Sequence, residues 1–565
     1  MRSTDAGLSQ WFCAALLALK GVGTAVASGS STSGCSDCRT SRFLTVKTTN
    51  GPITGHIAPG TSSSCVVEYL GIPYAKPPVG DLRFAAPQPL DAQSPYTAAE
   101  YGFDCPLSPS KAVDYPGFTP QAQRVINYFA SGAGTTQSED CLTLNVWSKA
   151  TPVTAARKKP VIVFFYGGRK SSAEPVAGET CACELTPPGF SIGNTNSPFY
   201  NGQHFANAQD VVVVTVNYRV NIFGFPGGPG ETQNLGLRDQ RAAVEWVRNN
   251  IANFGGDAKR IVLAGQSSGG VSADYWSYAY ESDPIAAGLV LVSGTAFSFP
   301  LNTPGVLDRN WNTVVAAVGC NTTTPADAAT TMACMRVASW TAIKTAAAAI
   351  KPAASTSVLR SIPAFYPQVD NQLVFSDYPE RTSAGRFARL PILAGNNDNE
   401  AGYYRIPAYG NGVVPTAAQV AAFHLESFTC AVAASAAARR AYAVPAWVYR
   451  YFADWENTRL YPGSGAYHGV DLHMVFGGSE EVSGIAATAE QRALVDVVQR
   501  AWYAFARDPQ AGLERDLGWP QSQPGHSTVV ELGLDNSAEV SFADPAVYDA
   551  SCVNVTLGSL GVPAA

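Results

Sequence analysis

Residues 261–270 read IVLAGQSSGG, an apolar run that leads into two adjacent serines between glycines. Only one register of this stretch matches the pattern Gly-x-Ser-x-Gly, with Gly265, Ser267 and Gly269 at the fixed positions. In a sharp strand-to-helix turn, small residues two positions before and after a nucleophilic serine relieve the crowding of a strained backbone. A plain glycine turn explains the same letters. The rest of the chain must therefore decide between the two interpretations.

Apolar runs on both sides of this stretch indicate a buried parallel sheet. Residues 161–165, 211–216, 261–263 and 289–292 have the length and β-branched content of strands that are covered on both faces. Residues 235–257 carry apolar side chains at intervals of three and four and end near two glycines, which predicts a crossover helix. This alternation predicts an α/β fold with a mostly parallel central sheet flanked by helices and with ligand chemistry at the carboxyl ends of the strands.

The bulk properties of the 565-residue chain exclude some partners. Its formal net charge is −6 without a long basic run, and this argues against binding to nucleic acid. Residues 1–27 have an early Arg, a short apolar stretch and a small-residue end, which predicts a cleaved signal peptide. Lys20 keeps this apolar stretch below the roughly 18 residues of a membrane span, so we expect no stable membrane insertion. Residues 28–40 form a Ser/Gly-rich linker, and 41–562 are expected to be one catalytic domain.

Cysteines and glycosylation patterns agree with a secreted, extracellular protein. The chain has 12 cysteines, which fits an oxidising compartment. If Cys13 leaves with the signal peptide, the odd number that remains predicts one cysteine without a partner in the chain. Two patterns for N-glycosylation begin at Asn321 and Asn554.

A catalytic serine needs partners further along the chain. An imidazole must take its proton and an acid must orient that imidazole, and the order in this fold is serine, acid, histidine. Of the four later histidines, His468 lies in the glycine-flanked loop GSGAYHGVDLHMVFG. The run 390–394 predicts another strand, which places Asp398 and Glu400 at its carboxyl end. Glu400 precedes a small-residue turn, a position that suits an orienting acid.

Seven segments have the order and spacing of one enzyme family: YLGIPYAKPPVGDLRF, SEDCLTLNVW, VNYRVNIFGF, DQRAAVEWVRNNIANFGGD, AGQSSGG, NNDNEAG and YHGVDLHMVFG. With them, the chain resembles the cholinesterase-type (type-B) carboxylesterases and lipases, an α/β-hydrolase group, and in particular its secreted fungal members. The resemblance runs from about residue 41 to about residue 555. It implies Ser267 as nucleophile, Glu400 as acid and His468 as base, with Ser293 hydrogen-bonded to the acid. It implies neither a cofactor nor a metal.

The resemblance also places an oxyanion hole after residues 161–165, where this chain departs from the family. The usual glycine triplet is here Tyr166-Gly167-Gly168-Arg169. The backbone N–H groups of Gly168, Arg169 and Ser268 are the expected donors, and Gly167 with Gly168 is the alternative pair from the loop. Because one lost donor costs about 2.7–4 kcal/mol of transition-state stabilisation, Arg169 must present its N–H with the guanidinium turned away.

Family resemblance further implies pairs of cysteines. It pairs Cys105 with Cys141 and Cys320 with Cys334, suggests Cys430 with Cys552, and leaves five cysteines unassigned: Cys35, Cys38, Cys65, Cys181 and Cys183. The last two lie in residues 169–202, which either border the mouth of the site or form a stapled surface loop. An apolar helical face within residues 125–129 is either a lid or packed on the body of the protein.

The function implied is a carboxylic ester hydrolase that acts on a small-molecule ester through an acyl-enzyme on Ser267. Neutral Gln266 stands where cholinesterases carry a glutamate, and the loop between Cys105 and Cys141 has no Trp, so a choline ester is disfavoured. Three alternatives stay open: a triacylglycerol lipase, an acyltransferase with the same acyl-enzyme, and a non-catalytic adhesion or binding protein of the same fold. The acyl and alcohol parts of the ester, and the oligomeric state, do not follow from the sequence.

Overall fold

The structure is a computed structural model. It describes residues 44–555 except for 62–63, 93, 109–112, 131–133, 151–157, 169–188, 303, 322–326, 352–356 and 361. The expected signal peptide (1–27) and linker (28–40) lie outside the described residues.

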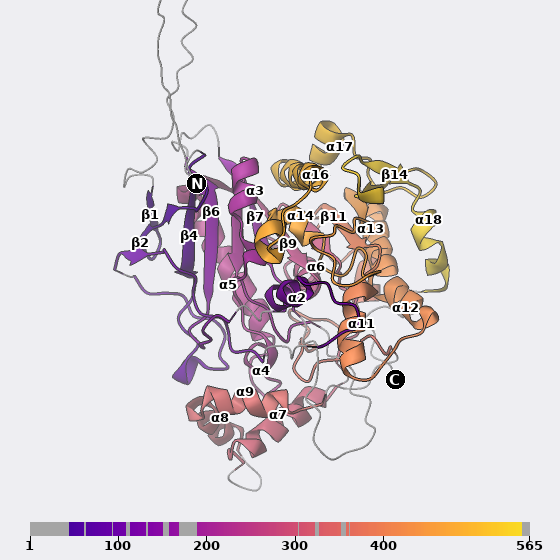
Figure 1. Ribbon diagram of the computed structural model, residues 1–565. Coiled ribbons are helices and arrows are strands. Elements are labelled where there is room, and N and C mark those ends of the chain that lie inside the picture. The colour runs from indigo at the N-terminus through magenta and orange to yellow at the C-terminus, as the bar shows by residue number, and fades with distance from the viewer. Residues whose placement is uncertain are drawn as a thin grey trace, which may run out of the picture.

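A central sheet of 11 strands organises the described chain (Figure 1). Seven neighbouring strands, from β8 through β7 and β9 to β13, run parallel, and the strands at both margins are antiparallel. The mostly parallel sheet expected from the apolar runs is thus confirmed. In spatial order its strands are β14 (Ser541–Ala543), β13 (Val529–Leu532), β12 (Ala446–Tyr451), β11 (Ile392–Asn397), β10 (Gly288–Val292), β9 (Gly256–Gln266), β7 (Lys159–Phe165), β8 (Val212–Val216), β6 (Thr143–Lys149), β4 (Val66–Pro73) and β3 (His56–Ile57). A small second sheet contains β1 (Thr45–Thr48), β2 (Gly51–Thr54) and β5 (Tyr96–Thr97).

Helices cover both faces of the large sheet. One face packs α3 (Gln203–Ala208) and α16 (Ala489–Arg507), and the other packs α5 (Leu235–Asn250), α6 (Ser268–Ala279) and α13 (Cys430–Ala441). Helix α5 is the expected crossover helix, which continues as a 3₁₀ turn and ends at Gly255 with a φ of +85°, a left-handed conformation that favours glycine.

The remaining helices form smaller packing units. Helices α7 (Val306–Ala317), α8 (Ala328–Val337) and α9 (Trp340–Ala348) lie together at the lower edge in Figure 1, where they pack around a second apolar cluster. The others are α2 (Ala122–Phe129), α4 (Asn221–Gly224), α10 (Tyr378–Ser383), α11 (Ala401–Gly410), α12 (Ala417–His424), α14 (Leu472–Phe476), α15 (Ser479–Ser483), α17 (Gly512–Leu517) and α18 (Ala546–Asp549). Short 3₁₀ turns span Gly80–Leu82, Pro198–Tyr200, Ile251–Phe254, Leu534–Asn536 and Ala550–Asn554, and a π-helical turn spans Leu425–Thr429.

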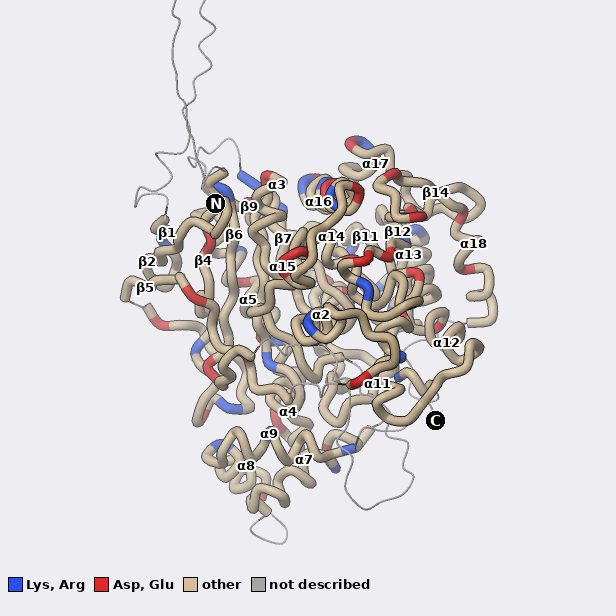
Figure 2. The backbone as a smooth tube through the Cα atoms, in the orientation of Figure 1, with Lys and Arg blue, Asp and Glu red and all other residues tan. Residues whose placement is uncertain are grey.

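The surface and the helix lengths bear on possible partners. Basic and acidic residues are interspersed in the view of Figure 2, without one face of a single sign. Within the described residues, one helical run, Ala417–Ala441, is long and apolar enough to span a membrane by length and composition. Half of its apolar stretch is buried inside the protein, as in a core helix.

Candidate active site

Ser267 stands at the turn between β9, which ends at Gln266, and α6, which begins at Ser268. Its φ of 56° and ψ of −122° are strained for a residue with a side chain. A Cβ on Gly265 would lie 2.1 Å from the carbonyl oxygen of Gly269, and one on Gly269 would lie 2.0 Å from that of Phe165. The chain therefore makes a sharp, strained strand-to-helix turn at Ser267, with no room for a side chain at Gly265 or Gly269.

His468 and Glu400 form a buried pair close to this turn. His468 Nδ1 is 2.5 Å from Glu400 Oε2, and both side chains are almost completely buried. The other carboxylate oxygen of Glu400 accepts hydrogen bonds from Ser293 Oγ and from the backbone N–H of Asn397, each at 2.7 Å. Three donors from three segments thus hold the carboxylate in one orientation.

The two acids that the sequence left open differ in their contacts. Asp398 is half-exposed and pairs with Arg450, with 3.0 Å between Oδ1 and a guanidinium nitrogen. The carboxylate that contacts the imidazole of His468 is that of Glu400. Among the other histidines, burial lowers the pKa of His473 to about 3, while burial and the charge of Arg450 lower that of His424 to about 4. Both are therefore neutral and lie in packed surroundings.

A second buried carboxyl, Asp471, follows His468 by three residues. Its oxygens accept hydrogen bonds from Asn397 Nδ2 at 3.2 Å and Tyr449 OH at 3.1 Å. Burial, supported by the charge of Glu400, raises the pKa of Asp471 to about 7. Sequence reasoning missed this residue, although its short spacing from His468 could have singled it out.

The loop after β7 reaches Ser267 through its glycines. A Cβ on Gly167 would lie 2.9 Å from Ser267 Cβ, and one on Gly168 would lie 1.8 Å from the carbonyl oxygen of Ile192. Neither position tolerates a side chain. Ser268 is the first residue of α6, so its N–H has no acceptor within the helix. Arg169, the remaining expected donor, lies outside the described residues.

Aromatic rings surround the imidazole of His468. Phe129 of α2 has its ring centre 6.4 Å from the His468 ring and also packs against Phe199 and Tyr403. From other directions, Tyr404 and Phe428 lie 5.0 Å and 5.3 Å from His468. Since Val125 and Ile126 of α2 are buried, this helix packs on the body while Phe129 reaches the site. The sequence singled out the helical face that contains Phe129, but it did not reveal Tyr404 and Phe428, which come from separate segments.

Three disulfides tie peripheral segments of the described chain: Cys105–Cys141, Cys320–Cys334 and Cys430–Cys552. Cys65 is disulfide-bonded as well. The cysteines at 35, 38, 181 and 183 lie outside the described residues. Within the described ranges, no group of three or more His, Cys, Asp or Glu side chains could hold a metal ion.

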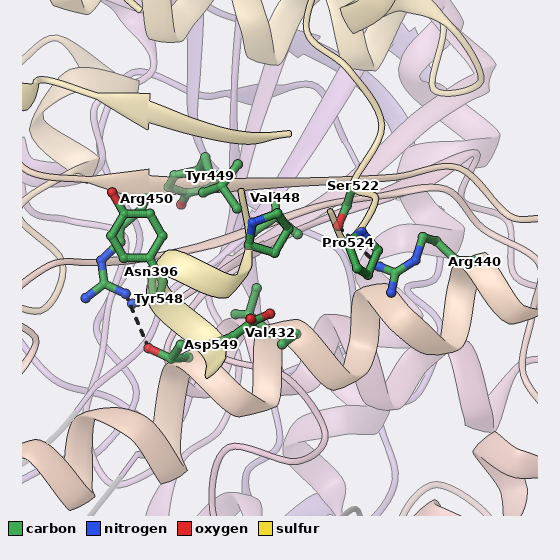
Figure 3. A pocket seen from close by; sticks show the side chains of 14 residues that line it. Asn396, Val432, Arg440, Val448, Tyr449, Arg450, Ser522, Pro524, Tyr548 and Asp549 are labelled. Carbon is green, nitrogen blue, oxygen red and sulfur yellow. Dashed lines mark hydrogen bonds between the residues drawn. The ribbon is translucent and has the colours of Figure 1, made fainter. Parts of the chain in front are cut away.

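A separate cleft opens between α13, β12 and α18 (Figure 3). Its empty volume is about 490 Å³. At one end Arg440 donates to Ser522 Oγ at 3.2 Å, and at the other Arg450 donates to Thr429 Oγ1 at 3.4 Å. Ser267 and His468 do not line this cleft, and we assign it no function.

Comparison with known proteins places this geometry in a family. The sequence profile of the Carboxylesterase family matches residues 42–418. The chain belongs to the carboxylesterase family. It is 33% identical over 526 residues to "Secreted lipase 5" of Gibberella zeae, and the alignment covers 86% of this chain and 90% of that protein. It is 31% identical over 478 residues to "Chlorogenic acid esterase" of Aspergillus niger, which covers 83% of each.

A solved structure of a PNB esterase shares the fold. The alignment covers 88% of this chain and 97% of that one, with a TM-score of 0.68 at 24% sequence identity. The α/β fold and the type-B carboxylesterase family expected from the sequence are thus confirmed. This carboxylesterase is an enzyme of the class that acts on carboxylic esters.

Proposed function

We propose that this carboxylesterase hydrolyses its ester through an acyl-enzyme on Ser267, with His468 as general base and Glu400 as the orienting acid. The observation that carries the proposal is the buried 2.5 Å contact between His468 Nδ1 and Glu400 Oε2 beside the strained turn of Ser267. Donation of the Nδ1 proton to Glu400 leaves the Nε2 lone pair of the neutral imidazole available as the base.

The reaction then has two stages, formation of the acyl-enzyme and its hydrolysis. Ser267 Oγ attacks the ester carbonyl while its proton passes to His468 Nε2, and the tetrahedral intermediate collapses when that proton moves to the leaving alcohol. A water molecule, deprotonated by the same nitrogen, cleaves the acyl-enzyme and releases the acid. The oxyanion is stabilised by the backbone N–H groups of Gly168, Arg169 and Ser268, or by Gly167 in place of Arg169. The tight packing of Gly167 and Gly168 supports this arrangement.

We infer that the substrate is a neutral ester with an apolar or aromatic part. The rings of Phe129, Tyr404 and Phe428 near His468 offer apolar contact, and Gln266 beside the base carries no charge to favour a cation. The relative named chlorogenic acid esterase supports an aromatic ester, whereas the relative named secreted lipase favours a lipase as the second candidate. We further propose secretion of one domain, 41–562, which the disulfides support.

Hydrolysis of p-nitrophenyl esters of increasing chain length, with and without an oil interface, tests this function. Ser267→Ala is expected to lose at least about 10⁴-fold in kcat because the nucleophile is gone. The same change at Ser339, an exposed serine before α9, serves as the matched control and should leave the rate unchanged. A Ser267→Ala protein with the activity of the wild type would rule out the acyl-enzyme. A rate that rises steeply only at the interface would identify a lipase.

A further inference from the structure

The nitrogen that must accept the serine proton already has a partner in this structure. Gln266, the last residue of β9, is fully buried, and its side-chain Nε2 lies 3.0 Å from His468 Nε2. Among the described residues, Gln266 and Glu400 are the two hydrogen-bond partners of the imidazole. Ser267 Oγ is not one of them.

The Gln266 amide lies between two loops of the site. A Cβ on Gly167 would lie 2.6 Å from Gln266 Oε1, and a Cβ on Gly469 would lie 3.4 Å from Gln266 Nε2. The amide is therefore confined between the loop after β7 and the loop that carries His468. Its Oε1 atom is buried and has no hydrogen-bond partner among the described residues, so within them the amide is bonded through its NH₂ end.

The chemistry of the two groups sets the protonation state that they favour. With the Nδ1 proton donated to Glu400, Nε2 of a neutral imidazole can only accept, and an amide NH₂ can only donate. The opposite amide orientation would aim two acceptors at each other. A protonated imidazole would aim an N–H at the NH₂ group. The contact therefore stabilises the neutral imidazole over the imidazolium.

We propose that Gln266 is a positioning residue that occupies His468 Nε2 in the free enzyme, keeps the base neutral, and yields that nitrogen to Ser267 when an ester enters the site. This inference rests on the proposed roles of Ser267, His468 and Glu400. It assigns to Gln266 a task that a glutamate at the same position could not perform, because an ionised carboxylate has no proton to donate.

A substitution at Gln266 removes none of the other titratable side chains described around His468. Glu400 and Tyr404 face it from the β11–α11 segment, and Asp471 lies on its own segment, where it is bonded to Tyr449 of β12. Phe129 of α2 and Phe428 of the π-helical turn carry no charge. Gln266→Met therefore removes one amide and none of these groups.

Gln266→Met tests the inference, because methionine has a similar volume and no N–H donor. Two measurements report ionisations of the free enzyme. They are the acid limb of kcat/KM for p-nitrophenyl acetate and the pH dependence of Ser267 labelling by a p-nitrophenyl phosphonate. We expect both to move to higher pH by about half to one unit, the equivalent of one ordinary hydrogen bond. Gln266→Glu should move them further, because a carboxylate favours the imidazolium.

Controls separate this role from simple packing. Gln499 of α16 is also buried and donates to the carbonyl oxygen of Val475 at 3.0 Å, so Gln499→Met should lower stability without moving either pH profile. An acid limb that stays in place or moves to lower pH in Gln266→Met would overturn the inference. If that variant does not fold, an unshifted limb in Gln266→Glu has the same meaning. An active Ser267→Ala protein would instead overturn the proposed function itself.

Discussion

Two buried carboxyl groups lie near the imidazole, and their contacts give them different properties. Glu400 accepts three hydrogen bonds, one of them from His468. Asp471 accepts from the side chains of Asn397 and Tyr449, and burial, together with the charge of Glu400, raises its pKa to about 7. Glu400 is thus bonded to His468, while the charge of Asp471 changes near neutral pH.

Asp471 makes stability depend on pH. Its pKa rises from 3.8 to about 7 on folding, so the folded protein holds this proton more tightly than the unfolded chain does. Stability from this group is complete below pH 3.8, falls as the pH rises to about 7, and stays low above that. We expect Asp471→Asn to gain stability relative to the wild type at pH 8 compared with pH 4, by about 4 kcal/mol at most. Urea unfolding at both pH values measures this difference, and an equal effect at both would contradict it.

At the scale of elements, a fully buried ion pair joins α6, the helix that follows Ser267, to its neighbours. Arg439 of α13 lies 2.9 Å from Asp274 of α6, and neither side chain is exposed. Asp274 also accepts a hydrogen bond at 2.8 Å from the backbone N–H of Ala296, which follows Ser293 in the loop after β10. The pair therefore connects three segments that support Ser267 and Glu400.

Asp274→Ala is expected to destabilise the protein by about 3–5 kcal/mol, because it leaves the Arg439 charge buried without a partner. The double variant Asp274→Ala with Arg439→Met removes that charge and should recover part of the loss. Denaturant unfolding of the two variants and of the wild type measures both effects. A double variant no more stable than Asp274→Ala would show that the unpaired charge is not the cause.

At the scale of the whole molecule, one continuous apolar core extends from Ile53 to Leu532, so the described strands stabilise one another across the entire sheet. The C-terminal segment beyond β14 is attached by Cys430–Cys552, which closes a sequence separation of 122 residues. Both glycosylation patterns begin at exposed residues, Asn321 and Asn554. This arrangement suits passage through a secretory pathway.

Expression of the full chain in a eukaryotic secretory host tests this prediction. We expect the protein in the medium, with residue 28 at its N-terminus and with a lower mass after glycosidase treatment. Asn321→Gln and Asn554→Gln should each remove one glycan, which intact-mass spectrometry resolves. Full-length protein retained inside the cell with its first 27 residues attached would contradict the prediction.

The sequence by itself determined the parallel sheet, the crossover helix and the sharp turn at Ser267. Apolar periodicity and the close approach of Gly265 to Gly269 each involve only a few neighbouring residues, so a short stretch of sequence reveals them. Family resemblance added His468 and Glu400 as expectations. The structure brings the expected Glu400 to His468, and only the tertiary structure decided that Gln266 reaches the same imidazole and that Asp471 lies close to Glu400. These contacts join residues up to 202 positions apart, and such distances depend on how strands and loops pack.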